Sequence, residues 1–327
     1  MRAAAVGRAG WDLLAVRSPS SPSSQPSDLP TPAAVMARAG GENFPVASRV
    51  LPRRVREHLL ALYGFARLVD ELGDARAAGA AGAGGATGAT EAAGAGGAGE
   101  PLHRLAALDW LEGELERVYA DGARHPLLVR MQRTVRACAL PRDPFLRLIE
   151  ANRIDQRVAR YDTWEQLLGY CHLSADPVGE LVLGVFGAAT PERVALSDRI
   201  CTALQLAEHW QDVAEDLRAG RVYLPAEDLG RFGCTERDLD HRVAAWRVKG
   251  LMAFEVARTR ELLGEGAPLV GTLHGRERLA VAAFVSGAEA ALGAIERAGY
   301  DVLGGPPRAS RARRAAALAR TLAERWR

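Results

Sequence analysis

The sequence is built of segments with helical periodicity and contains almost no sign of strands. From about residue 54 to 74, apolar side chains recur at spacings of three and four, the period of one helix face. The same period returns in residues 276–299, and "TPERVALSDRICTALQLAEHWQDVAEDL" can run as one helix that ends before Gly220. No stretch alternates convincingly between apolar and polar residues. We therefore predict an all-α fold with a single domain from about residue 41 to 305.

Two helix starts are signalled by the residues that precede them. Thr163 and Gln166 have the spacing of a capping box, in which side chains satisfy the first backbone N–H groups. Thr190 followed by Pro191 is typical of an N-cap with proline at the first helical position. The sequence thus predicts that helices begin just after Thr163 and Thr190.

Three segments differ in composition from the predicted domain. Residues 1–40 contain the run "RSPSSPSSQPSDLPTP", which buries too little apolar surface to fold, so we expect a disordered extension. Met36 is then a candidate for the true start. Residues 77–100 are an Ala/Gly-rich insertion, expected to be a flexible surface segment between two helices. Residues 306–327 form a basic helical tail with seven arginines and one glutamate.

The composition is that of an ordinary soluble protein. The 327 residues are 48% hydrophobic and 25% charged, and the net charge of +2 argues against nucleic-acid binding. The four cysteines form no C-x-x-C pair and are widely separated, which argues against a zinc ribbon or a disulfide scaffold and indicates reduced thiols in the cytoplasm. There is no 18-residue apolar run and no signal-peptide pattern, so we predict no membrane-spanning helix.

Two aspartate pairs, each with a spacing of four, are the most informative chemical feature. Asp70 and Asp74 in "YGFARLVDELGD" share a helix face with Arg67. Asp212 and Asp216 lie in "QLAEHWQDVAEDLRAGRVYLP". Two carboxylates at this spacing are most often a solvated helix face. The apolar surroundings of both pairs, and the arginines near each, favour a binding site instead.

Carboxylates on facing helices suit a magnesium-bound diphosphate. Glu208 and Gln205 lie one and two helical turns before Asp212, so they add side-chain oxygens to the face that carries the second aspartate pair. Mg²⁺ takes few protein ligands and keeps positions for water and phosphate. Such a clamp stabilises a diphosphate leaving group and so generates a carbocation, which aromatic faces can shield. The aromatic candidates are Tyr63, Phe65, Tyr170, Trp210 and Tyr223. Packing in the core is the alternative role for each of them, and it is the better interpretation of Phe65.

A di-iron centre is another use of carboxylates on helices, and the sequence argues against it. That centre needs Glu-x-x-His on two helices. The single match, from Glu100 to His103, contains a proline and borders the Ala/Gly-rich insertion. The histidines otherwise show no ligand spacing, and we interpret His209 as structural or cavity-lining.

These stretches resemble the squalene/phytoene synthase family over about residues 41–305. "YGFARLVDELGD" is similar to the family's first Asp-rich motif. "QLAEHWQDVAEDLRAGRVYLP" is similar to the second, which typically reads Q-L-x-N-x-x-R-D-V-x-E-D and then G-R-x-Y-L-P. "ENFPVASRVLP", "RYDTWEQLLGYC", "YCHLSADPVGELVL" and "AGYDVL" resemble the hopanoid-associated branch, and within it hydroxysqualene synthases. The resemblance implies an isoprenoid synthase helical bundle with a central prenyl cavity.

The resemblance also implies an activity. Enzymes of that branch convert presqualene diphosphate and water to hydroxysqualene and diphosphate, and we expect this Mg²⁺-dependent reaction here, in squalene and hopanoid biosynthesis. Head-to-head condensation of two prenyl diphosphates to squalene, dehydrosqualene, phytoene or presqualene diphosphate stays open. A non-catalytic relative is a further alternative, against which the four retained aspartates argue.

Expectations about partners and location follow from the same resemblance. The partner is a prenyl diphosphate substrate, with functional coupling to other squalene-pathway enzymes, and the location is the cytoplasm. Arginines of the tail could contact anionic lipid at the inner face of the membrane, and a solvated helix is the alternative interpretation of the tail.

Site residues are carried over from the family position by position. The four aspartates would hold Mg²⁺ and diphosphate. Glu208 replaces the usual asparagine, and either adds a magnesium ligand or weakens diphosphate binding. Gln211 replaces the arginine of carotenoid-type members, as expected of the hydroxysqualene branch, which leaves one cation fewer beside the diphosphate. The remaining candidates carried over are Arg67 and Asn43 for the diphosphate, Tyr170, Ala175, Val178 and Gly179 along the cavity, and Gln205 and the catalytic Tyr223 near the reacting carbons. Two further substrate-binding candidates rest on the residues themselves: Arg221, an arginine near the second aspartate pair, and Tyr63, an aromatic ring that can shield a cation.

Overall fold

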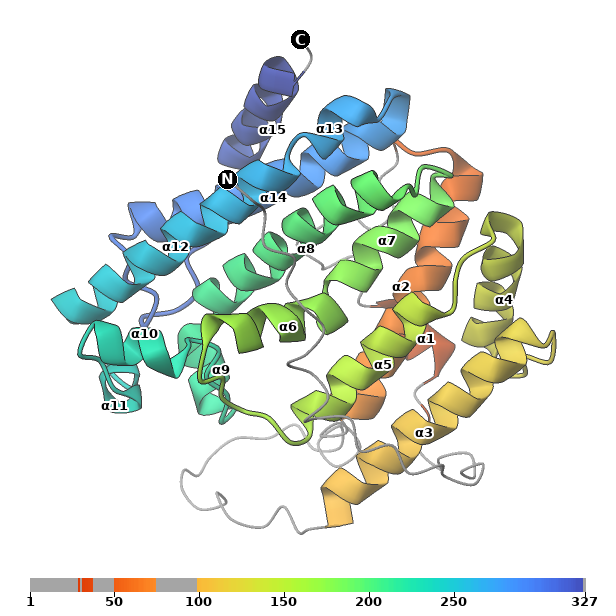
Figure 1. The fold of residues 1–327 in the computed structure, drawn as a ribbon, viewed down its shortest axis with the longest axis horizontal. Helices are drawn as coiled ribbons and strands as arrows, with labels where there is room; N and C mark the ends of the chain where they lie inside the picture. Colours follow the sequence, from red (N-terminus) through yellow and green to blue (C-terminus); the bar gives the residue numbers. More distant parts are fainter. Residues whose placement is uncertain (1–28, 30, 38–49, 75–98, 326–327) are drawn as a thin grey trace, which may run out of the picture.

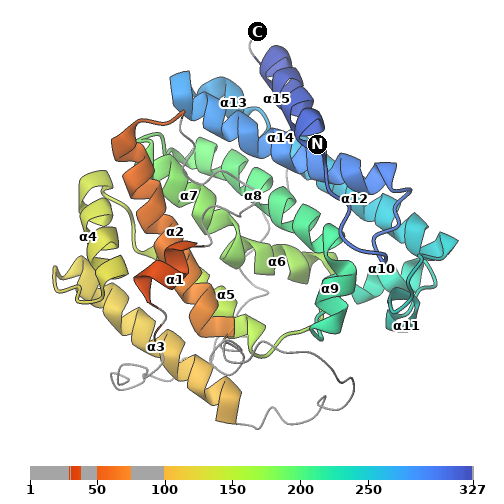
Figure 2. The same ribbon diagram turned by 180° about the vertical axis from the view of Figure 1, so that it is seen from behind.

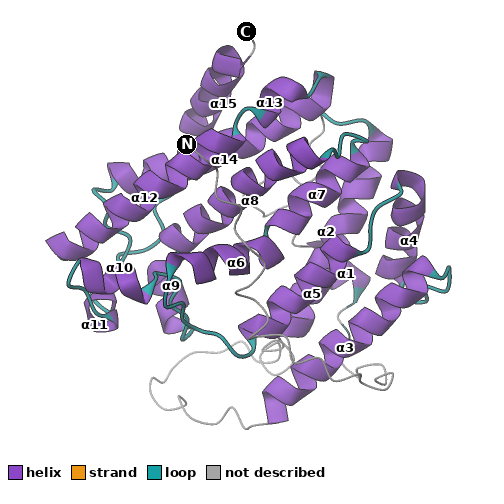
Figure 3. Cartoon of the chain, viewed as in Figure 1, coloured by secondary structure: helices purple, strands orange, loops and turns teal. Residues whose placement is uncertain are grey.

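The computed structural model describes residues 29, 31–37, 50–74 and 99–325, and over these residues the regular elements are helices (Figures 1 and 3). The only strand-like pairing there is an isolated bridge between Arg160 and Val222. The all-α prediction is therefore confirmed. Asn43, most of the N-terminal extension and the insertion up to residue 98 lie outside the described residues. The helices are α1 (Pro32–Ala37), α2 (Arg53–Asp74), α3 (Gly99–Tyr119), α4 (Pro126–Cys138), α5 (Asp143–Asp155), α6 (Trp164–Ser174), α7 (Asp176–Val185), α8 (Pro191–Gln211), α9 (Val213–Arg218), α10 (Ala226–Arg231), α11 (Glu236–Leu239), α12 (Trp246–Gly266), α13 (Leu269–Thr272), α14 (Gly275–Arg297) and α15 (Arg311–Arg325).

Buried side chains gather in two clusters that meet at α7. One cluster surrounds Trp210 and joins α6, α8, α12 and α14. The other joins α2, α3, α4 and α5, where Phe65 and Phe145 meet edge to face with ring centroids 5.1 Å apart. Leu183 of α7 belongs to the first cluster and Leu181 to the second, because the two side chains leave opposite sides of the helix. The helix therefore ties the halves together, and α8 lies beside it near the middle of the molecule (Figures 1 and 2).

The predicted helix starts are confirmed by their caps. The Thr163 hydroxyl accepts a hydrogen bond from the Gln166 N–H at 3.3 Å, and the Gln166 side chain accepts one from the Asp162 N–H at 2.8 Å. The second bond reaches one residue further back than in a regular capping box. At α8, Thr190 accepts from the Arg193 N–H at 3.3 Å and Pro191 takes the first helical position.

The expected unbroken helix after Thr190 is wrong, because the chain leaves helical geometry at Asp212. This residue has φ −102° and ψ 13°, so α8 ends at Gln211 and α9 begins at Val213. The Asp212 carbonyl accepts hydrogen bonds from the N–H groups of Glu215 and Asp216, both at 2.8 Å. The second aspartate pair therefore lies on a new turn. Gly220, with φ 82°, follows α9 in the left-handed conformation that glycine adopts readily.

The N-terminal extension is ordered in one part where we expected disorder. Residues 32–37 form α1, and Val35 is fully buried against the second core cluster. The apolar sequence "AAVM" after the Ser/Pro-rich run supplies this contact. A short segment gains order here because it can bury an apolar side chain on a folded neighbour.

Helix α14 is, among the described residues, the one helix long and apolar enough to span a membrane. Half of its most apolar window is buried inside the protein. It packs against α8, α12 and α15, and Ala282, Ala288 and Leu292 are fully buried. These contacts explain its apolar composition as that of a core helix.

Candidate active site

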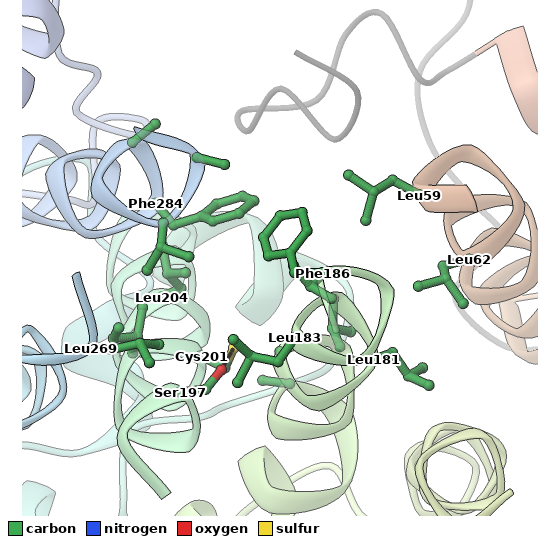
Figure 4. A pocket seen from close by; sticks show the side chains of 18 of the residues that line it. Leu59, Leu62, Leu181, Leu183, Phe186, Ser197, Cys201, Leu204, Leu269 and Phe284 are labelled. Carbon is green, nitrogen blue, oxygen red and sulfur yellow. Dashed lines mark hydrogen bonds between the residues drawn. The ribbon is translucent and has the colours of Figure 1, made fainter. Parts of the chain in front are cut away.

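A cavity of about 540 Å³ opens between α2, α7, α8 and α14 (Figure 4). Its wall is almost entirely apolar, and Figure 4 shows side chains from several helices pointing into it. The volume lies within the range of small-molecule sites. A wall of this kind binds a hydrocarbon chain by removing apolar surface from water. The labelled lining residues are Leu59, Leu62, Leu181, Leu183, Phe186, Ser197, Cys201, Leu204, Leu269 and Phe284.

The polar part of the lining is small. Most of it comes from α2 and α8, and Ser174 of α6 and Arg276 of α14 add to it. Tyr63 lines the cavity from α2, and Gln205 and Glu208 line it from α8. Both helices run in the same general direction in the two views (Figures 1 and 2). Asp70 and Asp212 follow the last lining residue of each helix by one turn. The carboxylates thus border one end of an apolar cavity.

On α2, Arg67 lies between two carboxylates. Its Nη1 is 3.8 Å from Asp70 Oδ2, and its Nε is 3.6 Å from Glu71 Oε1. Arg67 and Glu71 are partly buried, whereas the Asp70 side chain is 49% exposed. Nothing is described of the Asp74 side chain, although its backbone ends α2. The arginine and Asp70 therefore share one face, as the sequence spacing predicts.

The second pair forms a cluster with excess negative charge. Burial raises the pKa of Asp216 to about 7, with a smaller contribution from the charge of Asp212, while Arg221 opposes the rise. Burial also raises the pKa of Asp212, Glu215 adds to it, and the positive charge of Arg308 opposes it. Carboxylates with raised pKa values are incompletely compensated by neighbouring cations, so an added cation would stabilise their ionised form.

The donor set around these aspartates fits a magnesium ion that also binds substrate. Among the described side chains, no group of three or more His, Cys, Asp or Glu converges as a ready-made metal site. Mg²⁺ needs no such cage, because it often takes one or two carboxylates and completes its shell with water and phosphate oxygens. Asp212 and Asp216 supply the one or two carboxylates that a magnesium ion bound in this way requires.

Behind the acidic cluster lies a buried aromatic group that the sequence only partly indicated. Tyr223 stacks on His209 with ring centroids 3.6 Å apart, and Tyr161 and Tyr170 each lie 5.9 Å from Tyr223. The Tyr170 hydroxyl donates to Asp155 Oδ2 at 3.0 Å. Neither Tyr170 nor Tyr223 belongs to the lining of the described cavity, and both rings are buried in the core beside it. Their predicted places along the substrate stay predictions.

His209 is a neutral link between the cavity lining and Asp216. Burial, and then the charge of Arg221, lowers the pKa of His209 to about 3. Its Nε2 lies 3.1 Å from the Gln205 side-chain nitrogen, and its Nδ1 lies 4.0 Å from Asp216 Oδ2. With the Gln205 amide as donor, Nε2 accepts and the ring proton resides on Nδ1, facing the carboxylate. The interpretation of His209 as structural thus agrees with its buried position.

Three further candidates, Ala175, Val178 and Gly179, line the cavity from α7 and its N-cap. Gly179 lets α7 approach α8 closely, since a Cβ there would lie 2.6 Å from Cys201 Sγ and nearer still to Ser197 Oγ. A side chain at this position therefore requires the Ser197 and Cys201 side chains to move.

We expect Gly179→Ala to lower the free energy of unfolding by about 1 kcal/mol, because the added methyl group overpacks against the Ser197 and Cys201 side chains. Gly113 of α3 is a matched control, since nothing lies within 4 Å of its Cβ position. Gly113→Ala should raise stability, by up to about 1 kcal/mol, through helix propensity alone. Urea unfolding followed by circular dichroism measures both; equal stabilisation by the two substitutions would contradict the close packing at Gly179.

The cavity and its acidic border define a protein that binds an apolar chain with a charged end. The chain matches the family profile described as squalene/phytoene synthase over residues 37–315. It therefore belongs to the squalene/phytoene synthase family, and is an enzyme that acts on prenyl diphosphates. The matched range includes the domain expected between residues 41 and 305.

Individual relatives point to two branches of the family. A hydroxysqualene synthase of Rhodopseudomonas palustris is 33% identical over 233 residues, 71% of each chain. A phytoene synthase of Arthrospira platensis is 29% identical over 274 residues, 80% of this chain and 82% of the relative.

Solved structures agree with the fold. The squalene synthase HpnC from Alicyclobacillus acidocaldarius is 43% identical, with a TM-score of 0.69 over 83% of this chain and 92% of that one. A dehydrosqualene synthase in complex with a ligand gives a TM-score of 0.74 at 21% identity, over 90% and 95% of the two chains. The predicted isoprenoid synthase bundle is confirmed.

Proposed function

We propose that the protein converts presqualene diphosphate and water to hydroxysqualene and diphosphate in a Mg²⁺-dependent reaction. The observation that carries the proposal is an apolar cavity bordered at one end by carboxylates. The name of the hydroxysqualene synthase relative and the motifs of the hopanoid-associated branch support the choice of substrate. The product would feed squalene and hopanoid synthesis.

In this proposal the chain binds the two ends of the substrate differently. Leu62, Leu204 and Phe284 enclose the hydrocarbon in the cavity. Arg67 and Arg221 bind the diphosphate by charge-assisted hydrogen bonds. The four aspartates would hold the magnesium ion, which when bound supplies positive charge that stabilises the leaving diphosphate.

The bond that breaks joins the substrate carbon to the diphosphate oxygen, and the electron pair leaves with diphosphate. The resulting cyclopropylcarbinyl cation rearranges and is captured by the oxygen of water. Gln205 and Glu208 are polar residues of the described lining on α8, and we assign them the water. The Glu208 carboxylate accepts the proton that the captured water releases.

The test is product analysis by gas chromatography and mass spectrometry. Purified protein with Mg²⁺ receives presqualene diphosphate in one reaction and farnesyl diphosphate in another. Hydroxysqualene from the first reaction, and no product from the second, is the expected result. Product from farnesyl diphosphate would place the protein with the condensing enzymes, and silence in both reactions would favour a non-catalytic member.

A further inference from the structure

The chain after α14 returns to the acidic end of the cavity. Residues 301–310, which we call the C-terminal strap, run from α14 to α15. Val302 and Leu303 are buried at its start, and the Asp301 carboxylate accepts a hydrogen bond from the Ala244 N–H at 3.2 Å and lies 3.7 Å from Lys249 Nζ. The strap is therefore held on the folded protein before it reaches its middle.

The middle of the strap is attached at the break between α8 and α9. The side-chain amide of Gln211 donates a hydrogen bond to the Pro307 carbonyl, across 96 residues of sequence. Gln211 is the neighbour of Asp212, and Pro307 is the neighbour of Arg308. Adjacent Cα atoms are about 3.8 Å apart, so this one bond brings Arg308 within side-chain reach of the Asp212 carboxylate.

The far end of the strap is fixed by α15. The Ser310 hydroxyl accepts from the Arg313 N–H at 3.4 Å, and Ala317 and Thr321 are buried where α15 packs on α14. Leu318 contributes to the cavity wall. The C-terminal helix therefore packs on the protein and contributes to the cavity wall, and it is not a wholly solvated helix.

The charge at the middle of the strap is available for a ligand. Arg308 is exposed and makes no ion pair with a carboxylate among the described residues. The hydrogen bond from Gln211 to Pro307 nonetheless keeps it beside the partly buried Asp212. An arginine at the border of an acidic cluster, without an ion pair to its carboxylates, can bind an anion. The same anion can be bound to the carboxylates through a cation between them.

We propose that Arg308 binds the diphosphate of the substrate, and that the hydrogen bond from Gln211 to Pro307 positions it beside Asp212. This inference rests on the diphosphate-binding part of the proposed function. It adds to the site a residue from the C-terminal strap, far in sequence from both aspartate pairs.

The experiment measures binding of inorganic diphosphate at saturating Mg²⁺ by isothermal titration calorimetry. Arg308→Gln should weaken binding about tenfold, the value of one charge-assisted hydrogen bond at an exposed position. The loss should shrink as ionic strength rises, because the contact is screened. Arg313→Gln removes the same charge from an exposed position five residues further on and should leave binding within about twofold of the parent.

A double-mutant cycle tests the positioning by Gln211. Gln211→Leu removes the bond to Pro307, and it should weaken diphosphate binding as Arg308→Gln does. The double variant should bind no more weakly than Arg308→Gln alone, because both changes remove one contact. Full additivity would overturn the positioning role, and unchanged binding in Arg308→Gln would overturn the proposal.

The outcomes separate this inference from the proposed reaction. Inorganic diphosphate has no prenyl chain, so its binding is independent of which product the enzyme makes. Loss of diphosphate affinity in Arg308→Gln, with no hydroxysqualene from the parent, would support Arg308 and refute the reaction. Hydroxysqualene from the parent, with unaltered diphosphate affinity in Arg308→Gln, would support the reaction and refute the role of Arg308. A parent protein that binds no inorganic diphosphate would overturn the inference about Arg308, and product analysis would still decide the reaction.

Discussion

Replacing Asp212 by asparagine is expected to reduce turnover of the prenyl diphosphate by at least about a hundredfold, while the fold stays intact. The substitution removes one of the carboxylates assigned to the magnesium-bound diphosphate, and loss of a single electrostatic stabiliser in an active site has effects of this size. Asp212 is partly exposed, and its hydrogen bonds at the α8–α9 break use the backbone. Asparagine preserves those bonds.

The charges of the acidic cluster also predict how Asp212→Asn affects stability. The charge of Asp212 contributes to the raised pKa of Asp216, so Asp212→Asn should lower the pKa of Asp216 and relieve repulsion. The variant should therefore be at least as stable as the parent in urea while it is inactive. A structural role for Asp212 predicts the opposite, that activity and stability fall together.

Glu215→Gln is the matched control. Glu215 lies on the same turn, and its charge also raises the pKa of Asp212, but its side chain is exposed to solvent. This variant should keep turnover within about threefold of the parent, since surface charges contribute little. Product formation is followed by mass spectrometry; parental turnover in Asp212→Asn would remove Asp212 from the site.

Local features of the fold could be predicted from the sequence because local interactions determine them. The caps at Thr163 and Thr190, and α2 and α14, follow from periodicity and from side chains three residues away. The break at Asp212 could not be predicted this way, because the residues around it have ordinary helix propensity. Gly220 is the first strong helix terminator after it.

The parts of the site that escaped prediction depend on contacts between distant residues. The stacking of Tyr223 on His209 is one example, because nothing in the local sequence "GRVYLP" indicates which buried side chain this ring contacts. The bond from Gln211 to Pro307 has no sequence signal, because Gln211 is read there only as a departure from a family motif. Spacing identifies which residues share a helix face, whereas packing decides what that face meets.

The largest expected loss of stability comes from Arg258, a residue that the sequence did not single out. Its guanidinium donates to both oxygens of Glu255 at 2.7 Å and to Asp228 Oδ2 at 2.6 Å, and it lies 3.5 Å from the ring centroid of Trp164. The Glu255 side chain is fully buried and that of Asp228 is 6% exposed. One arginine therefore neutralises two buried carboxylates and connects α12 to α10 and α6.

We expect Arg258→Ala to lower the free energy of unfolding by about 3–5 kcal/mol at pH 8, because it leaves two buried carboxylates without their partner. Arg260→Ala, on the same helix, removes an arginine whose pairs with Glu289 and Glu296 are partly exposed, and it should cost about 1 kcal/mol or less. Equal losses in the two variants, measured by urea unfolding, would show that burial of the network contributes nothing.

The pH dependence of the loss identifies its cause. Burial already raises the pKa of Glu255 to about 8 with Arg258 in place, and a raised carboxyl pKa gives stability that is lost as pH increases towards that value. Without the arginine, the pKa of Glu255 should rise further, so protonation relieves the variant at low pH. The deficit of Arg258→Ala should therefore be smaller at pH 5 than at pH 8. A deficit independent of pH would instead assign the loss to the stacking of Arg258 on Trp164.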